Sequence, residues 1–197
     1  MQSYWQLAAG LGVALALSAC ASNTYAVLTT YDAQSQARIR LFGQNQKPTI
    51  MDVCQPSGKT QRINVGGSMG DAFSSFTRTA SNHSLGIAPS ETTRQLARQD
   101  GILSKALYRE FAIPAGKPVN LRAAYVGLTT TYSTPAHIVT MREGSCRSAS
   151  ASFVPQAGHD YEVVSLQHGR QCGISVFDLT DVGQPVAVAL EPLQKCR

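Results

Sequence analysis

Apolar and polar residues alternate along much of this chain, almost without interruption from residue 107 onward, and this alternation most constrains its fold. In the stretch 119–125, Val119, Leu121, Ala123 and Tyr125 would share one face of a strand. About nine such stretches, separated by turn residues, are typical of an antiparallel β-sandwich whose two sheets bury their apolar faces. The predicted strands cover residues 37–42, 50–53, 62–65, 107–113, 119–125, 137–141, 161–166, 172–177 and 186–190, with a weaker signal over 147–153.

Two corners of the predicted sandwich share one pattern of residues. One strand stops at Pro114 and the next begins after Gly116, and Pro155 and Gly158 stand in the same places later in the chain. Proline blocks a strand from continuing in its ladder, and glycine supplies the positive φ of the corner. These corners resemble those of small immunoglobulin-like or prealbumin-like periplasmic sandwich modules, which implies a mainly β domain of that kind.

One short helix is predicted within the β pattern, over residues 91–99. Ser90 suits the N-cap because its hydroxyl can accept a hydrogen bond from a free amide of the first turn. Glu91 follows where the helix dipole favours a negative charge, and Gly101 ends the pattern. The apolar stripe of this segment is thin, so we expect a short lid across one end of the sheets.

The amino-terminal segment predicts export. Residues 7–17 form an uncharged apolar run, and Ser18, Ala19 and Cys20 follow it. The run fits the roughly 7–15 residues of a secretory signal and falls short of the roughly 20 residues of a membrane-spanning helix. The tetrapeptide Leu17-Ser18-Ala19-Cys20 resembles the lipobox of bacterial lipoproteins.

The lipobox resemblance implies removal of a signal peptide over residues 1–19, a diacylglyceryl group on the Cys20 thiol, and an acyl chain such as palmitate on the new amino terminus. These chains exceed the two membrane signals that stable anchoring requires. Ala21 stands where an Asp tends to retain such lipoproteins at the inner membrane, so we expect the outer membrane, facing the periplasm. The inner membrane, the cell surface and an ordinary secretory signal stay open as alternatives.

The boundaries of the amino-terminal region follow from its composition. Residues 1–6 contain no Lys or Arg, so either the amino terminus supplies the positive charge of the signal or the true start lies upstream of Met1. Residues 20–36 are rich in Ser, Thr, Gln and Asn, which predicts a flexible lipidated tether. Residues 37–197 are predicted to form one β-sandwich domain.

Four cysteines remain once Cys20 is assigned to lipid. An even number in an oxidising compartment favours disulfides, and no two of the four have the short spacing of zinc ligands. Three pairings exist. We favour Cys146–Cys172, which flank consecutive strands, and Cys54–Cys196, which would join the first strands of the domain to the last one.

The charge of the chain is basic, with 17 Lys and Arg against 12 Asp and Glu. The basic residues are scattered, and an exported location makes nucleic acid a poor partner. The densest pairs are Arg38 with Arg40 and Arg94 with Arg98, and we expect them on a solvated surface facing an anionic envelope.

Motifs for catalysis or cofactors are weak in this sequence. The glycines at 66–70 lack the lysine of a phosphate loop, no Gly-x-Ser-x-Gly elbow occurs, and the histidines lack metal-site spacing, so we expect no cofactor and no metal. The nearest approach to a carboxylate cluster is predicted to be solvated surface, with Glu162 on the polar face of its strand. The cluster comprises Asp160, Glu162, Asp178 and Asp181.

Tyr125 and Tyr132, with the threonines at 129–131 between them, predict a polar aromatic loop that can bind a sugar or a protein. Together these features indicate a non-catalytic binding or interaction module, anchored in the membrane by its lipid. Its expected partner is an envelope protein or a polysaccharide. The alternative is an envelope hydrolase that acts on a cell-wall or polysaccharide substrate.

Overall fold

The computed structural model describes residues 31–67, 81–100, 104–127, 129–135, 137–142 and 144–196. Cys20, the predicted signal peptide and most of the predicted tether therefore lie outside the described residues. In the described part of the chain, no helix combines the length and the hydropathy of a membrane span.

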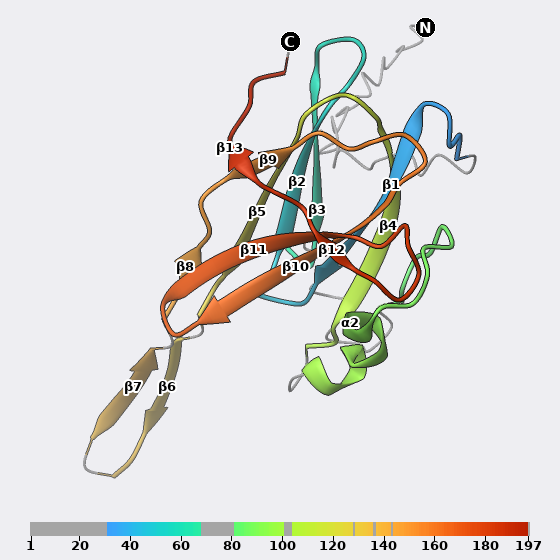
Figure 1. The fold of residues 1–197 in the computed structure, drawn as a ribbon. Coiled ribbons are helices and arrows are strands. Elements are labelled where there is room, and N and C mark those ends of the chain that lie inside the picture. The colour runs from blue at the N-terminus through green and yellow to red at the C-terminus, as the bar shows by residue number, and fades with distance from the viewer. Residues whose placement is uncertain are drawn as a thin grey trace, which may run out of the picture.

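Two sheets form most of the molecule, as the alternation predicts (Figure 1). In the five-stranded sheet, every neighbouring pair is antiparallel except β1 and β10, which run parallel from Arg38 opposite Asp160 to Leu41 opposite Val163. The prediction of a mainly β sandwich is thus confirmed, with one parallel pair that strand patterns alone did not reveal. Across the sheet the order is β12 (Val186–Ala187), β11 (Gln171–Asp178), β10 (Asp160–His168), β1 (Gln36–Gly43) and β4 (Leu107–Pro114).

The six-stranded sheet is antiparallel in all its pairs. The core lies between the two sheets, where alternate residues such as Ile39, Met51 and Leu121 are 0–1 % exposed. The order across this sheet is β13 (Glu191–Pro192), β9 (Ala151–Phe153), β5 (Val119–Tyr125), β2 (Thr49–Cys54) and β3 (Thr60–Val65), and β8 (Cys146–Arg147) also pairs with β5.

The outer face of the five-stranded sheet is covered rather than solvated. Arg40 is 1 % exposed, and its guanidinium pairs with Glu110 at 2.7 Å and with Glu162 at 3.0 Å. It also donates to the carbonyl oxygens of Ile87 and Ala88, so residues 84–90 lie across this face. The predictions of a solvated Arg40 and a solvated Glu162 are therefore wrong. Alternation marks the two faces of a strand, but it does not reveal that a distant segment covers the polar one.

The helix follows that covering segment. The Ser90 hydroxyl accepts from the Thr93 amide at 3.1 Å, which confirms the predicted N-cap, and it donates to Glu162 at 2.6 Å. The α-helical part is shorter than expected, because α2 (Glu91–Arg94) gives way to a 3-10 helix, η1 (Leu96–Gln99). Leu96 is buried against Phe42 in a small second core, so even a thin apolar stripe anchors the segment.

The segment predicted as a polar loop is a strand. β6 (Thr129–Ser133) pairs with β7 (Ile138–Arg142), and the resulting hairpin projects beyond the sandwich (Figure 1). The prediction of a strand near 137–141 is confirmed, and the loop prediction for 129–132 is wrong. Consecutive threonines show no alternation, but their β-branched side chains favour extended backbone when a partner strand is present.

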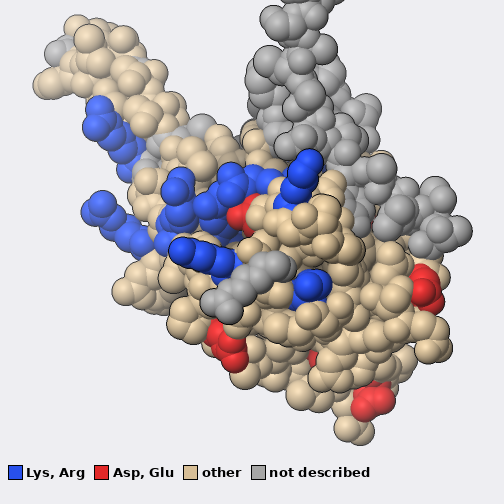
Figure 2. Space-filling view, turned by 90° about the horizontal axis from the view of Figure 1, so that it is seen from above, with Lys and Arg blue, Asp and Glu red and all other residues tan. Residues whose placement is uncertain are grey.

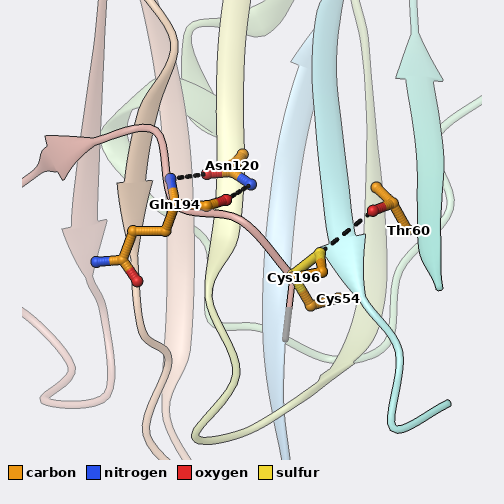
Figure 3. The surroundings of a disulfide bond; sticks show 5 residues. All are labelled: Cys54, Thr60, Asn120, Gln194 and Cys196. Carbon is orange, nitrogen blue, oxygen red and sulfur yellow. Dashed lines mark hydrogen bonds between the residues drawn. A yellow bond between two sulfur atoms is a disulfide. The ribbon is translucent and has the colours of Figure 1, made fainter. Parts of the chain in front are cut away.

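Both favoured disulfides are present. Cys54 joins Cys196 and Cys146 joins Cys172, with Cα atoms 5.3 and 5.5 Å apart. Figure 3 shows the first of them, where the carboxyl-terminal tail crosses the outside of the six-stranded sheet. Upstream, Asn120 accepts from the Gln194 amide at 3.0 Å and donates to its carbonyl oxygen at 2.8 Å. The tail is therefore held at two points.

Candidate binding site at the hairpin end

A small pocket opens where strands β1, β5 and β10 run toward the β6–β7 hairpin. Its volume is about 150 Å³, and Phe42, Leu96, Tyr125 and Leu166 provide much of its apolar lining. Ser165 in its wall shares a hydrogen bond of 3.0 Å with the fully buried Thr49 hydroxyl. A space of this volume accommodates a group about the size of a benzene ring.

Polar groups surround the mouth of the pocket. The Gln44 side-chain amide donates to the carbonyl oxygens of Gln99 and Ser104 at 2.8 and 2.9 Å, which fastens the 3-10 helix to the rim. The Lys47 ammonium lies 5.8 Å from the centroid of the Tyr125 ring, within the range of a cation–π contact. Tyr125 thus lies at a pocket, as its prediction as a binding residue requires. The side chain of Tyr132 lies outside the described part of the structure.

The base of the hairpin is stapled to the sandwich beside this pocket. Tyr125 pairs with Cys146 across β5 and β8, so the excursion that carries the hairpin begins and ends on paired strands. The Cys146–Cys172 disulfide then ties this base to β11 of the other sheet, and Cys172 also lines the pocket. The disulfide therefore forms part of the pocket wall.

The hairpin end also exposes apolar side chains. Ile138 is 75 % exposed, Met141 60 %, Val126 54 % and Leu166 53 %. Within the described residues, β6 and β7 pair with each other alone, which leaves strand edges of the kind that other chains can pair with. We call the hairpin, its disulfide and the pocket the hairpin end. The sequence did not predict the exposed apolar side chains of the hairpin end. In a hairpin outside the core, alternation does not distinguish a buried face from an exposed one.

A second cleft, of about 510 Å³, contains an aspartate–histidine pair. His159 Nδ1 and Asp178 Oδ2 lie 2.7 Å apart. Burial favours the neutral acid, but hydrogen bonds from Thr180 and His159 outweigh it and lower the pKa of Asp178 below its ordinary value. Burial raises the pKa of Tyr161, which lines the same cleft. This cleft therefore holds titratable groups with perturbed pKa values.

The structure divides the four acids that the sequence groups together. Asp178 and Asp181 both line the aspartate–histidine cleft. Asp160 instead makes a two-bond contact with Arg38, at 2.7 Å for each bond, and Glu162 is engaged by Arg40. Among the residues that the structure describes, no group of three His, Cys, Asp or Glu side chains is placed to hold a metal ion.

Comparison of the sequence with protein-family models and with curated proteins, and of the fold with solved structures, gave no match. The arguments about function therefore start from the geometry of the hairpin end and of the aspartate–histidine cleft.

Proposed function

We propose that this protein is a lipid-anchored, non-catalytic binding module of the bacterial cell envelope, and that its partner docks on the hairpin end. The observation that carries the proposal is the projecting β6–β7 hairpin, which exposes Ile138 and Met141 and is stapled at its base. Exposed apolar surface marks interaction sites when it is gathered on one element. Ile138 and Met141, three residues apart on β7, present such surface on both faces of the hairpin. The proposed anchor is the acylated Cys20, in the outer membrane and facing the periplasm.

The position of the hairpin suits an anchored module. Gln36, at the start of β1, pairs with Pro114 just before β5 begins, whereas the hairpin follows the end of β5. Seven residues of β5 and five of β6, at about 3.3 Å each, separate the two sites by up to about 40 Å. In Figure 1 the start of β1 and the hairpin accordingly lie at opposite ends. A lipid attached upstream of β1 would leave the hairpin end uncovered.

The chemistry of the hairpin end favours a protein as the partner. Unpaired strand edges offer backbone hydrogen bonds to an extended segment, and the pocket beside them has room for one apolar side chain. Sugar sites instead rely on several polar groups around an aromatic platform. At this pocket the Gln44 amide is already engaged within the chain.

Crosslinking in intact envelopes tests the proposal. A photocrosslinking residue placed in the hairpin should form an adduct with one protein, and the double variant Ile138→Ser/Met141→Ser should reduce that adduct at least about tenfold. The matched control is Val182→Ser/Val186→Ser, which removes two apolar side chains of similar exposure, 82 % and 60 %, far from the hairpin. Adducts unaffected by the hairpin variant, or equally reduced by the control, would refute docking at the hairpin end.

The hydrolase alternative has one observation in its favour, the aspartate–histidine cleft. A His–Asp pair serves as a base when a nucleophile lies on the other ring nitrogen, and two carboxylates can cleave a glycosidic bond. Purified protein would be assayed on cell-wall and polysaccharide substrates beside Asp178→Asn and Asp181→Asn. If the natural chain turns over one of these substrates and either variant abolishes that turnover, the hydrolase would replace the binding module as the proposed function.

A further inference from the structure

Two arginines share the outer face of the six-stranded sheet. Leu121 and Ala123 of β5 point into the core, so Arg122 between them points outward. Arg147 of β8 pairs with Ala124, two residues along β5 from Arg122, and therefore lies on the same face. Diagonal neighbours of this kind have Cα atoms about 7–8 Å apart, a spacing at which two guanidinium groups can hold one phosphate or two adjacent ones.

Neither arginine is neutralised by the chain in the part that the structure describes. Asp52 is the nearest carboxylate by register on this face, and Arg62 occupies both of its oxygens at 2.7 and 3.0 Å. The Arg122 Nε is buried and has no hydrogen-bond partner among the described residues. Asn64 Oδ1 on β3 is also buried without a hydrogen-bond partner among the described residues. Asn64 and Arg122 lie on either side of Ile50, because both residues pair with it.

The acids of the two sheets are unevenly distributed. Four carboxylates lie on strands of the five-stranded sheet: Glu110, Asp160, Glu162 and Asp178. The first three are held by arginines of the same sheet, and Asp178 is held by His159 in a neighbouring turn. The excess positive charge of the chain is therefore left for other surfaces. Figure 2 shows Lys and Arg side chains gathered in a band on the side seen from above, with little acidic surface among them. We call the outer side of the six-stranded sheet around Arg62, Arg122 and Arg147 the basic face.

We propose that the basic face binds the phosphate groups of an anionic lipid surface, with Arg122 and Arg147 at its centre. A guanidinium presents paired N–H donors that match phosphate oxygens. Arg147 is exposed, and Arg122 is partly exposed with its Nε buried. An extended sheet face suits a surface of headgroups rather than a single small ligand, and the carboxyl-terminal tail borders this one at Asn120.

The choice of a lipid surface rests on the acylated Cys20 of the proposed function. About 16 tether residues between Cys20 and β1 have a root-mean-square length of about 20–24 Å. A bilayer would then be the anionic surface nearest to the basic face at all times.

Vesicle binding tests the inference with the full chain carrying Cys20→Ala, which has no acyl group. The measured quantity is the ratio of binding to phosphatidylglycerol-containing vesicles over binding to pure phosphatidylcholine vesicles, so that any contribution of the apolar residues 7–17 cancels. Arg122→Gln and Arg147→Gln should each lower this ratio about 5-fold, and the pair about 25-fold. The matched control is Arg94→Gln/Arg98→Gln, which removes the same charge from the helical segment.

Three results would overturn the inference. In the first, the control pair lowers the ratio as much as the Arg122 and Arg147 pair does, which would mean that bulk charge alone drives the binding. An anionic preference unchanged in the Arg122 and Arg147 pair would exclude the basic face. Retention on immobilised polyglutamate that depends on the two arginines, without vesicle binding, would identify an acidic protein in place of lipid. Because the test chain carries no acyl group, its outcome is separate from that of lipidation and of hairpin docking.

Discussion

The guanidinium of Arg40 lies between Glu110 and Glu162 on the covered face of the five-stranded sheet. The second oxygen of Glu110 accepts hydrogen bonds from the Ser84 hydroxyl and the Ile87 amide. This network fixes the segment that leads into the helix. Its members belong to strands distant in sequence, and each strand by itself reads as half solvated. Their burial is therefore set by tertiary structure and could not be predicted from the alternation around any one of them.

Replacing Arg40 should destabilise the fold strongly. In Arg40→Ala two buried carboxylates lose their cation, and the free energy of unfolding should fall by about 3–5 kcal/mol. The control Arg62→Ala removes an ion pair in which the arginine side chain is 57 % exposed, and should cost at most about 1 kcal/mol. Urea denaturation measures both, and similar losses in the two variants would contradict the structural role of Arg40.

Asp178 should make stability depend on pH. Its pKa is lowered in the folded state, so its charged form stabilises the fold above the unfolded-state pKa of about 3.9, and this contribution is lost as the pH falls through the lower folded-state pKa. Asp178→Asn should therefore be less stable than the natural chain at pH 7, and the difference should shrink below about pH 4. Thermal midpoints across this range test it; a difference that is constant with pH would refute it.

At the scale of elements, strands that bury one face were predicted well. β5 has the predicted bounds, and β1, β4, β10 and β11 differ from prediction by a few residues at their ends. The hairpin strand β6 was missed because it contributes no face to the core, and the segment 147–153 divides into β8 and β9. Strand patterns therefore located the sandwich but not the element on which we place the partner.

The Cys146–Cys172 disulfide should matter most to the hairpin end. Its loop spans 26 residues, and the chain-entropy model gives about 3.5 kcal/mol for its removal. In Cys146→Ala/Cys172→Ala, hydrogen exchange should accelerate at the hairpin base and protease should cut there first. Cys54→Ala/Cys196→Ala is the control, since it should instead release the carboxyl-terminal tail. The same cleavage pattern in both variants would contradict a local staple.

At the scale of the molecule, the two-sheet architecture and both disulfides followed from strand order and cysteine count. The parallel pairing of β1 with β10 did not, because the pattern of one strand carries no information on which neighbour lies beside it. The two surfaces that we assign to a partner and to lipid are likewise products of the assembled sheets. Arg122 and Arg147 are separated in sequence, and the register of β5 and β8 places them together.

The anchor can be tested on the whole molecule. Cys20→Ala removes the only atom to which the proposed diacylglyceryl group can attach, so the protein should move from the membrane fraction to the soluble fraction of lysed cells. Ser22→Ala, a substitution of similar size two residues away, should leave it in the membrane fraction. Unchanged fractionation of Cys20→Ala would remove the argument for a lipoprotein.

The place of β1 between β10 and β4 also governs when the chain can fold. Arg38 meets Asp160, 122 positions later, and Arg40 meets Glu110, 70 positions later. Pairings between residues so far apart in the sequence form slowly, because a long loop must close before they can form. A chain threaded through a pore with its amino end first thus keeps its first strand without either neighbour until most of it has passed. During that time the unpaired edges of β1 are open to other chains, so the same topology that delays folding also exposes the chain to aggregation.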